Sequence, residues 1–218
     1  MDLIQALAAE LGKDPRHVEN VVHLLDEGNT IPFIARYRKE LHGAMDDTSL
    51  RTLEERLQYL RGLEERREAV KKSIDEQGKL TDELAAAIDS AKTLAEVEDL
   101  YRPYKQKRRT RATIAKEKGL EPLAALLFAQ ERDCPRPEEA ARDFVDPEKG
   151  VETVEDALQG ASDIIAEQIS DDAAIRKSLR ALISRQGQLV SRAATEDDSV
   201  YRLYYDFTQS VARLQGHQ

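Results

Sequence analysis

The chain has 218 residues and a formal net charge of −9; 34% of its residues are charged and only 5% are aromatic. This length suits one large domain or two small ones and can bury a core without a disulfide or a metal ion. The abundant charge and scarce aromatic residues argue against a sandwich or barrel and favour amphipathic helices. No apolar run reaches the ~18–20 residues that span a membrane, and Cys134 alone cannot form an internal disulfide. We therefore expect a cytoplasmic protein without membrane association.

Two short helices are predicted at the start of the chain. Apolar residues recur at helical spacing over residues 3–11, and a glycine closes this stripe. Asp14-Pro15 is typical of an N-cap followed by proline in the first turn, and it opens a second helix that ends at Gly28. The pair resembles a helix-turn-helix, although most helices paired in this way are simply packed against each other.

A third helix, PFIARYRKE, starts at Pro32, and a long helix is predicted after it. Leucines at 3-4-3 spacing from Leu50 to Leu60 begin a periodic segment that extends from Asp46 to Gly78. This segment predicts one helix of nearly thirty residues, roughly 40 Å long at 1.5 Å per residue. Its outer face carries charges of both signs, which is typical of a solvated helix surface.

Threonine caps mark further helix starts. Thr81 precedes two acidic residues, and Thr93 and Glu96 have the spacing of a capping box. Either Thr110 or Thr113 opens a short helix after them.

The rigid Cys-Pro-Arg-Pro segment at residues 134–137 is the best candidate for an interior boundary. We expect an N-terminal helical region over residues 1–133, with the helix-turn-helix-like start and a basic segment at 102–118. We expect a second helical subdomain over residues 134–218.

Beyond this boundary the periodicity predicts three more helices and a last helix over residues 197–207. The segment QLVSRA after Gly187 has a strand pattern but no evident partner. The predicted fold class is all-α, a multi-helix elongated array with a helix-turn-helix-like pair and one long helix.

The sequence contains no catalytic or metal-binding motif. The histidines at positions 17, 23, 42 and 217 have neither the spacing nor the cysteine neighbours of a zinc site. Cys134 has no histidine pattern that would activate it, and the common nucleotide-binding and hydrolase motifs are absent. We predict no enzymatic activity, no cofactor, no metal ion and no small-molecule substrate.

One segment departs from the acidic average of the chain. Residues 101–120 carry a net charge of +7, which leaves −16 for the rest. Arginine and lysine side chains bind phosphate oxygens, and a tyrosine ring such as that of Tyr101 or Tyr104 can stack on an unpaired base. The residues predicted to contact nucleic acid are Lys105, Lys107, Arg108, Arg109 and Arg111.

A smaller basic patch, formed by Arg36, Arg38 and Lys39, surrounds Tyr37. Both basic clusters have an alternative interpretation. The cations of residues 101–120 can pair with acids on the long helix, and the arginines beside Tyr37 can hold helices together through buried carboxylate pairs. The composition leaves nucleic-acid contact and intramolecular or protein contact both open.

Three long strings resemble the Tex family of transcription accessory proteins. They are LLDEGNTIPFIARYRKE from Leu24, DDTSLRTLEERLQYLRGLEERR from Asp46 and EDLYRPYKQKRRTRATIAKEKGLEPLA from Glu98. VDPEKGV from Val145 is also similar to a family segment, and the resemblance extends over about residues 3–207.

The resemblance implies a bacterial relative of eukaryotic histone-chaperone elongation factors. In that family a helical N-terminal region with a helix-turn-helix precedes a nuclease-like inactive domain, helix-hairpin-helix modules and an S1 RNA-binding domain. The present sequence stops at YYDFTQSVARLQGHQ, where family members continue, so we expect the front portion of a longer protein.

The function implied is a non-catalytic helical scaffold module, associated with RNA or DNA in the full-length protein and with proteins of the transcription machinery. The alternative is a protein-interaction scaffold that docks on transcription or translation machinery without direct nucleic-acid contact.

Overall fold

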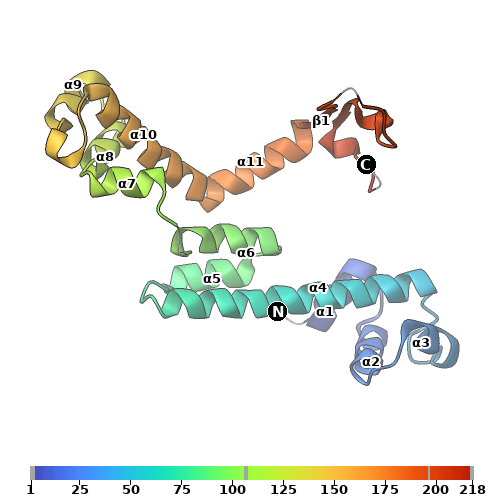
Figure 1. Ribbon diagram of the computed structural model, residues 1–218. Helices are drawn as coiled ribbons and strands as arrows, with labels where there is room; N and C mark the ends of the chain where they lie inside the picture. Colours follow the sequence, from blue (N-terminus) through green and yellow to red (C-terminus); the bar gives the residue numbers. More distant parts are fainter. Residues whose placement is uncertain (1–2, 106–107, 196, 217–218) are drawn as a thin grey trace. The chain divides into compact units, whose positions relative to one another are not determined.

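The computed structural model describes residues 3–105, 108–195 and 197–216 (Figure 1). Over these ranges the chain forms eleven α-helices and one two-stranded antiparallel sheet, so the predicted all-α class is confirmed. The chain divides into two compact units, Met1–Val97 and Glu98–Gln218, here called the N-terminal unit and the C-terminal unit. This division falls within α6 (Leu94–Tyr101). This position differs from the boundary predicted from the sequence between residues 133 and 134, and that boundary stays a prediction.

The elements of the N-terminal unit are α1 (Leu3–Leu11), α2 (Pro15–Asp26), α3 (Ile31–Tyr37), α4 (Asp47–Asp75), α5 (Asp82–Ser90) and the start of α6. The C-terminal unit continues with α7 (Arg111–Glu117), α8 (Glu121–Ala129), α9 (Pro137–Ala141), α10 (Val154–Asp171), α11 (Ala173–Gln186), β1 (Gln188–Arg192) and β2 (Asp206–Ser210). Short 3₁₀ turns occupy Arg102–Tyr104, Arg142–Phe144, Pro147–Lys149, Arg202–Tyr204 and Val211–Arg213.

Local sequence signals set the helix starts as predicted. The Asp14 carboxylate accepts a backbone hydrogen bond in the first turn of α2, where Pro15 is the first helical residue. Asp46 caps α4 by accepting a hydrogen bond from Ser49 N at 2.8 Å, and Thr81 caps α5 in the same way. Helix α4 has 29 residues, which confirms the prediction of one long helix.

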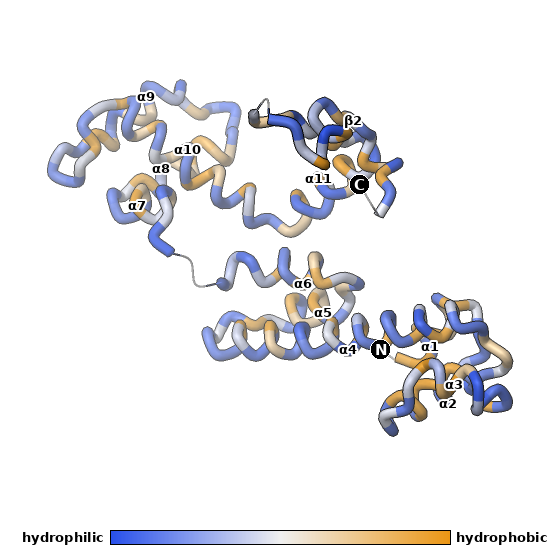
Figure 2. The backbone as a smooth tube through the Cα atoms, turned by 45° about the vertical axis from the view of Figure 1, so that its right-hand side comes forward, coloured by the Kyte–Doolittle hydropathy of each residue, from blue (hydrophilic) through white to orange (hydrophobic). Residues whose placement is uncertain are grey.

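The first half of α4 forms a core with α1, α2 and α3, which gather at that end of it (Figures 1 and 2). The apolar stripes predicted from the sequence supply the buried side chains, and each contributes about 1.5–3 kcal/mol on burial. Along its second half α4 packs against α5, and an ion pair joins Lys71 to Asp89 at 2.8 Å. In the core formed by α1, α2, α3 and the first half of α4, the fully buried side chains include Leu7, Val18, Ile34, Leu50 and Leu53.

Helix α10 is the centre of the second core, because α7, α8 and α9 all pack against it. It begins with a capping box formed by Thr153 and Asp156. Its buried face is made largely of small residues, so neighbouring segments approach closely. At Gly160 a Cβ atom would lie 2.3 Å from Leu120 Cδ1, so a larger residue there would require the buried leucine to shift.

The end of the C-terminal unit corrects one prediction. Residues 197–207 do not form a last helix: the described part of this stretch has a 3₁₀ turn at Arg202–Tyr204, and β2 begins at Asp206. Strand β2 pairs with β1, the predicted strand without a partner, and places Val190 opposite Thr208. The β1 backbone groups need partners outside their own segment, and the β-branched and aromatic residues of β2 suit an extended ladder.

In the N-terminal unit the buried imidazole ring of His42 makes no hydrogen bond to any described residue. His42 is only 1% exposed, and neither of its ring nitrogens has a hydrogen-bond partner among the described residues. Its backbone is fixed, because His42 N donates to Arg38 O at 3.3 Å. A buried polar group without a partner typically lowers stability by about 1–3 kcal/mol.

We expect His42→Leu to raise the free energy of unfolding by about 1 kcal/mol, because an apolar side chain of similar volume removes two unpaired polar atoms from the core. Urea denaturation followed by circular dichroism measures this change. The control is His23→Leu at an exposed position of α2, which should stay within about 0.5 kcal/mol of the wild type. A loss of more than about 1 kcal/mol in His42→Leu would show that the imidazole packs favourably as it stands.

Candidate nucleic-acid interface

The basic segment leads into α7 and is fastened to α10. Thr110 caps α7 by accepting a hydrogen bond from Thr113 N at 3.0 Å. The same hydroxyl group lies 3.0 Å from Glu167 Oε1 of α10. These bonds fix the start of α7 against the side of α10 and so determine where the neighbouring arginines lie.

An open groove of about 590 Å³ follows this contact. One wall is basic and the other is acidic, because α10 turns a row of carboxylates toward the basic segment. The basic wall consists of Arg102, Lys105, Arg108, Arg109 and Arg111. The opposite wall includes Asp163, Glu167, Ser170 and Asp171.

Four of the five predicted contact residues therefore line a single groove. They are Lys105, Arg108, Arg109 and Arg111, and the fifth, Lys107, lies outside the described residues.

Most of these cations already have a carboxylate partner. Lys105 is paired with Glu98, and Arg109 lies 2.7 Å from Glu117 Oε2. Arg102, at the edge of the groove, lies 3.0 Å from Asp171 Oδ1.

Arg111 and Arg108 differ from them. The Arg111 side chain is 84% exposed and keeps only a long ion pair of 3.7 Å with Asp163. Arg108 is exposed and has no ion pair with any residue that the structure describes. The pairing with acids that the sequence left open is thus present, but the acids come mainly from α6, α7 and α10.

Sequence reasoning missed the acidic wall. Asp163, Glu167 and Asp171 are spaced four residues apart, and this spacing places them on one face of a helix. The signal was readable, although nothing in the sequence showed that α7 would pack against that face.

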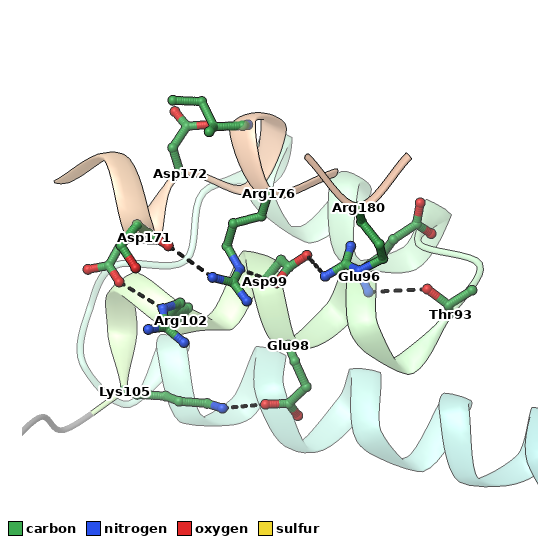
Figure 3. Close-up of polar contacts among 12 residues, drawn as sticks. Thr93, Glu96, Glu98, Asp99, Arg102, Lys105, Asp171, Asp172, Arg176 and Arg180 are labelled. Carbon is green, nitrogen blue, oxygen red and sulfur yellow. Dashed lines mark hydrogen bonds and ion pairs between the residues drawn. The ribbon is translucent and has the colours of Figure 1, made fainter. Parts of the chain in front are cut away.

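A second charged cluster holds α11 in place (Figure 3). Arg176 Nε and Arg180 Nη2, both from α11, each donate a 2.6 Å hydrogen bond to a different oxygen of the Asp99 carboxylate on α6. Asp99 is only 4% exposed. Burial by itself raises the pKa of Asp99, but the bonds from the two arginines outweigh it and hold the pKa below its ordinary value.

The smaller patch around Tyr37 lies at the end of α3. Arg36 and Lys39 are exposed and have no ion pair within the described part of the chain. The Arg38 guanidinium lies 5.2 Å from the centre of the Phe33 ring. Buried carboxylate pairs, the alternative considered for Arg36 and Arg38, are therefore not what these arginines form.

Other kinds of site find no support in the described residues. They contain no group of three or more histidine, cysteine, aspartate or glutamate side chains that could hold a metal ion. Cys134 is half-buried, and its Sγ lies 3.8 Å from Leu126 O. None of the helices that the structure describes is long and apolar enough to cross a bilayer.

The fold and the groove define a multi-helix protein with an exposed arginine segment beside a row of carboxylates. Two family models match it: the Tex-like protein N-terminal domain over residues 1–75 and the Tex central region-like domain over residues 133–218. The chain belongs to the Tex family.

Longer relatives align with almost all of this chain. It is 48% identical over 215 residues to Protein YhgF of Escherichia coli, covering 97% of this chain and 28% of that protein. It is 43% identical over 223 residues to Transcriptional accessory protein Tex of Neisseria gonorrhoeae, covering 100% and 29%. Human S1 RNA-binding domain-containing protein 1 is 29% identical over 228 residues, covering 100% and 22%. The chain thus spans less than a third of the length of these relatives.

We expect Asp99→Asn to lower the free energy of unfolding by about 1–3 kcal/mol at pH 7, because it removes a buried charge that two arginines share while those arginines remain partly solvated. The pKa of Asp99 is lowered in the folded protein, so its contribution is present above the ordinary carboxyl pKa of about 3.9 and is lost as the pH falls through the folded pKa. Urea denaturation of both proteins at pH 7 and at pH values down to about 3 measures the difference, which should shrink on acidification.

The control is Glu10→Gln, which breaks the more exposed pair with Arg56 and should change stability by less than about 1 kcal/mol. Equal stability of the wild type and Asp99→Asn at pH 7 would contradict the role assigned to this carboxylate.

Proposed function

We propose that this chain is the non-catalytic helical scaffold region of a cytoplasmic Tex-like transcription accessory protein that associates with RNA or DNA. The segment from Lys105 to Arg111 contacts the phosphate backbone. The observation that supports this contact is the exposure of Arg108 and Arg111 at the groove, where one guanidinium has no described ion pair and the other has only a long one.

Phosphate contact at this groove has a clear electrostatic requirement. The carboxylates of Asp163, Glu167 and Asp171 repel a polyanion that enters deeply, so the backbone must pass over the basic wall. Arginine suits this position because its planar group binds phosphate through two parallel hydrogen bonds. Binding should weaken steeply with salt, since each phosphate contact releases a counterion.

The names of two relatives support the same proposal. One is called a transcriptional accessory protein and another an S1 RNA-binding domain-containing protein. Because this chain spans less than a third of each, the nucleic-acid association of the whole protein belongs to the proposal. Partners in the transcription machinery are proposed on the same ground.

A protein-interaction scaffold is the second candidate function, and α11 favours it. This helix exposes four large apolar side chains on one face, at a spacing of four, three and one residues. They are Ile175, Leu179, Leu182 and Ile183. Affinity capture from lysate, with and without nuclease, separates the two functions, because a direct protein contact survives removal of nucleic acid.

We expect the triple change Arg108→Glu, Arg109→Glu and Arg111→Glu to weaken binding of a labelled RNA or DNA oligonucleotide by about tenfold or more at 50 mM salt. The slope of log affinity against log salt should fall by about 2–3, because each lost phosphate contact removes about 0.7–0.9 from it. Fluorescence anisotropy in a salt titration measures both quantities. A parallel triple change to glutamine removes the charges without placing new carboxylates beside Asp163 of the acidic wall.

The matched control changes Arg132, Arg136 and Arg142 to glutamate, since these exposed arginines of the same unit have no ion pair in the part that the structure describes. The net charge changes equally, so a general electrostatic effect would appear in both variants. Equal binding by the wild type, the groove variants and the control would refute phosphate contact at the groove, as would an absence of binding in all of them.

A further inference from the structure

Tyr37 is an exposed aromatic residue in the middle of an unneutralised basic patch. It is the last residue of α3, and it is 57% exposed although large aromatic side chains are usually buried. Arg36 and Lys39, on either side of it in sequence, are exposed and have no ion pair with any described residue.

The tyrosine ring packs against Phe33, which also contacts Arg38. The ring centres of Phe33 and Tyr37 are 5.3 Å apart with an interplanar angle of 46°, and the Arg38 guanidinium lies 5.2 Å from the centre of the Phe33 ring. Arg38 also donates to Tyr37 O at 3.3 Å. Phe33 therefore contacts both side chains, and Tyr37 is the more exposed of the two rings.

The turn that follows Tyr37, at residues 41–45, is held against the N-terminal core. Asn20 Nδ2 on α2 donates to Leu41 O at 3.0 Å, and the buried side chain of Met45 belongs to the core of the N-terminal unit. Gly43 has a φ of +57°, and a Cβ there would lie 2.2 Å from His17 Nδ1, so α2 lies close against this turn. Tyr37 and its basic neighbours thus project from a preorganised surface, which lowers the entropy cost of binding.

We propose that Tyr37, Arg36 and Lys39 form a platform for an unpaired nucleotide of a single-stranded nucleic acid, with the base on the tyrosine ring and the flanking phosphates on the two cations. Every base has a face that stacks on an aromatic ring, and cations beside the ring attract the backbone. Double-stranded nucleic acid offers no free base face at this position. This platform lies in the N-terminal unit and is separate from the groove proposed above.

The neighbouring helix α2 supports single-stranded over duplex recognition. A duplex-binding helix-turn-helix would present a basic second helix to the phosphates. The exposed acidic residues of α2 and its end are Glu19, Asp26 and Glu27. Its exposed arginine, Arg16, is already paired with Asp14 at 3.4 Å, and Asp26 is paired with Arg61 of α4 at 2.7 Å.

A purely structural role explains less. Phe33 and Arg38 cover each other at the end of α3, and that contact needs neither an exposed tyrosine ring nor unpaired charges at both sides of it. Proteins that bind single-stranded nucleic acids combine exposed aromatic rings with cations, and Tyr37 with Arg36 and Lys39 has this combination.

The chain contains no tryptophan, so Tyr37→Trp introduces a unique fluorescent reporter at the platform. We expect its emission to be quenched when 15-nucleotide oligo(dT) or oligo(rU) is added to the 218-residue protein at 50 mM salt, and to change little with a 15-base-pair duplex. The matched control is Tyr201→Trp at a 68% exposed tyrosine of the C-terminal unit, which should show no quenching.

A second set of variants tests the stacking itself. We expect Tyr37→Leu to weaken oligo(dT) or oligo(rU) binding about 5- to 100-fold, while Tyr37→Phe, which keeps an aromatic ring, stays within about twofold of the wild type. Arg36→Gln with Lys39→Gln should reduce the salt slope by about 1.4.

The same measurements in the background of the groove variant keep the two sites distinct. A Tyr37-dependent loss that persists there supports the platform even if groove binding has failed. Equal affinities of Tyr37→Leu and wild type, equal losses for single-stranded and duplex probes, or no single-strand binding by the wild type would each overturn the platform.

Discussion

The carboxylate of Asp99 holds α11 to α6 by charge rather than by apolar burial. Helix α11 has no buried residue, whereas α7, α8 and α9 are fixed by a shared apolar core on α10. Two hydrogen bonds of 2.6 Å to one buried carboxylate are charge-assisted, and bonds of this kind are roughly twice as strong as those between neutral groups. The ion pair between Arg102 and Asp171 fixes the junction of α10 and α11 in the same way. The arrangement of this half of the C-terminal unit therefore depends on which arginine meets which acid.

The same pairing decides which cations remain for a partner. Net charge over residues 101–120 overstates the field that a nucleic acid meets, because Arg102, Lys105 and Arg109 face carboxylates a few ångströms away. The groove is a mixed surface in which Arg108 and Arg111 are the exposed members of a partly neutralised set. A local count of charges identifies the basic segment, whereas the ion pairs to other elements determine which of its cations remain exposed.

Interactions between residues close in sequence could be predicted, whereas interactions between residues far apart in sequence could not. Helix caps such as Asp14, Asp46 and Thr110 act within two or three residues, so the sequence predicts the helix starts correctly. The hairpin was missed because paired residues such as Val190 and Thr208 lie 18 positions apart in the sequence, which is beyond the range of a local pattern. The bonds of Asp99 to α11 connect residues 77 and 81 positions apart, and no local pattern announces them. The basic segment and the shared helix face of Asp163, Glu167 and Asp171 can both be read from the sequence, but the packing of α7 against that face cannot.

The acidic composition of the chain makes the surroundings of each unpaired cation important. The chain has 42 acidic and 33 basic residues, so most of its surface repels a polyanion and weakens non-specific binding. Several exposed arginines have no ion pair within the described residues, among them Arg36, Arg108 and the three control residues Arg132, Arg136 and Arg142. The absence of an ion pair therefore does not by itself mark a site. Arg108 differs from the control residues because it lines the groove beside Arg111, and Arg36 differs from them because it is next to the exposed ring of Tyr37, a side chain on which a base could stack.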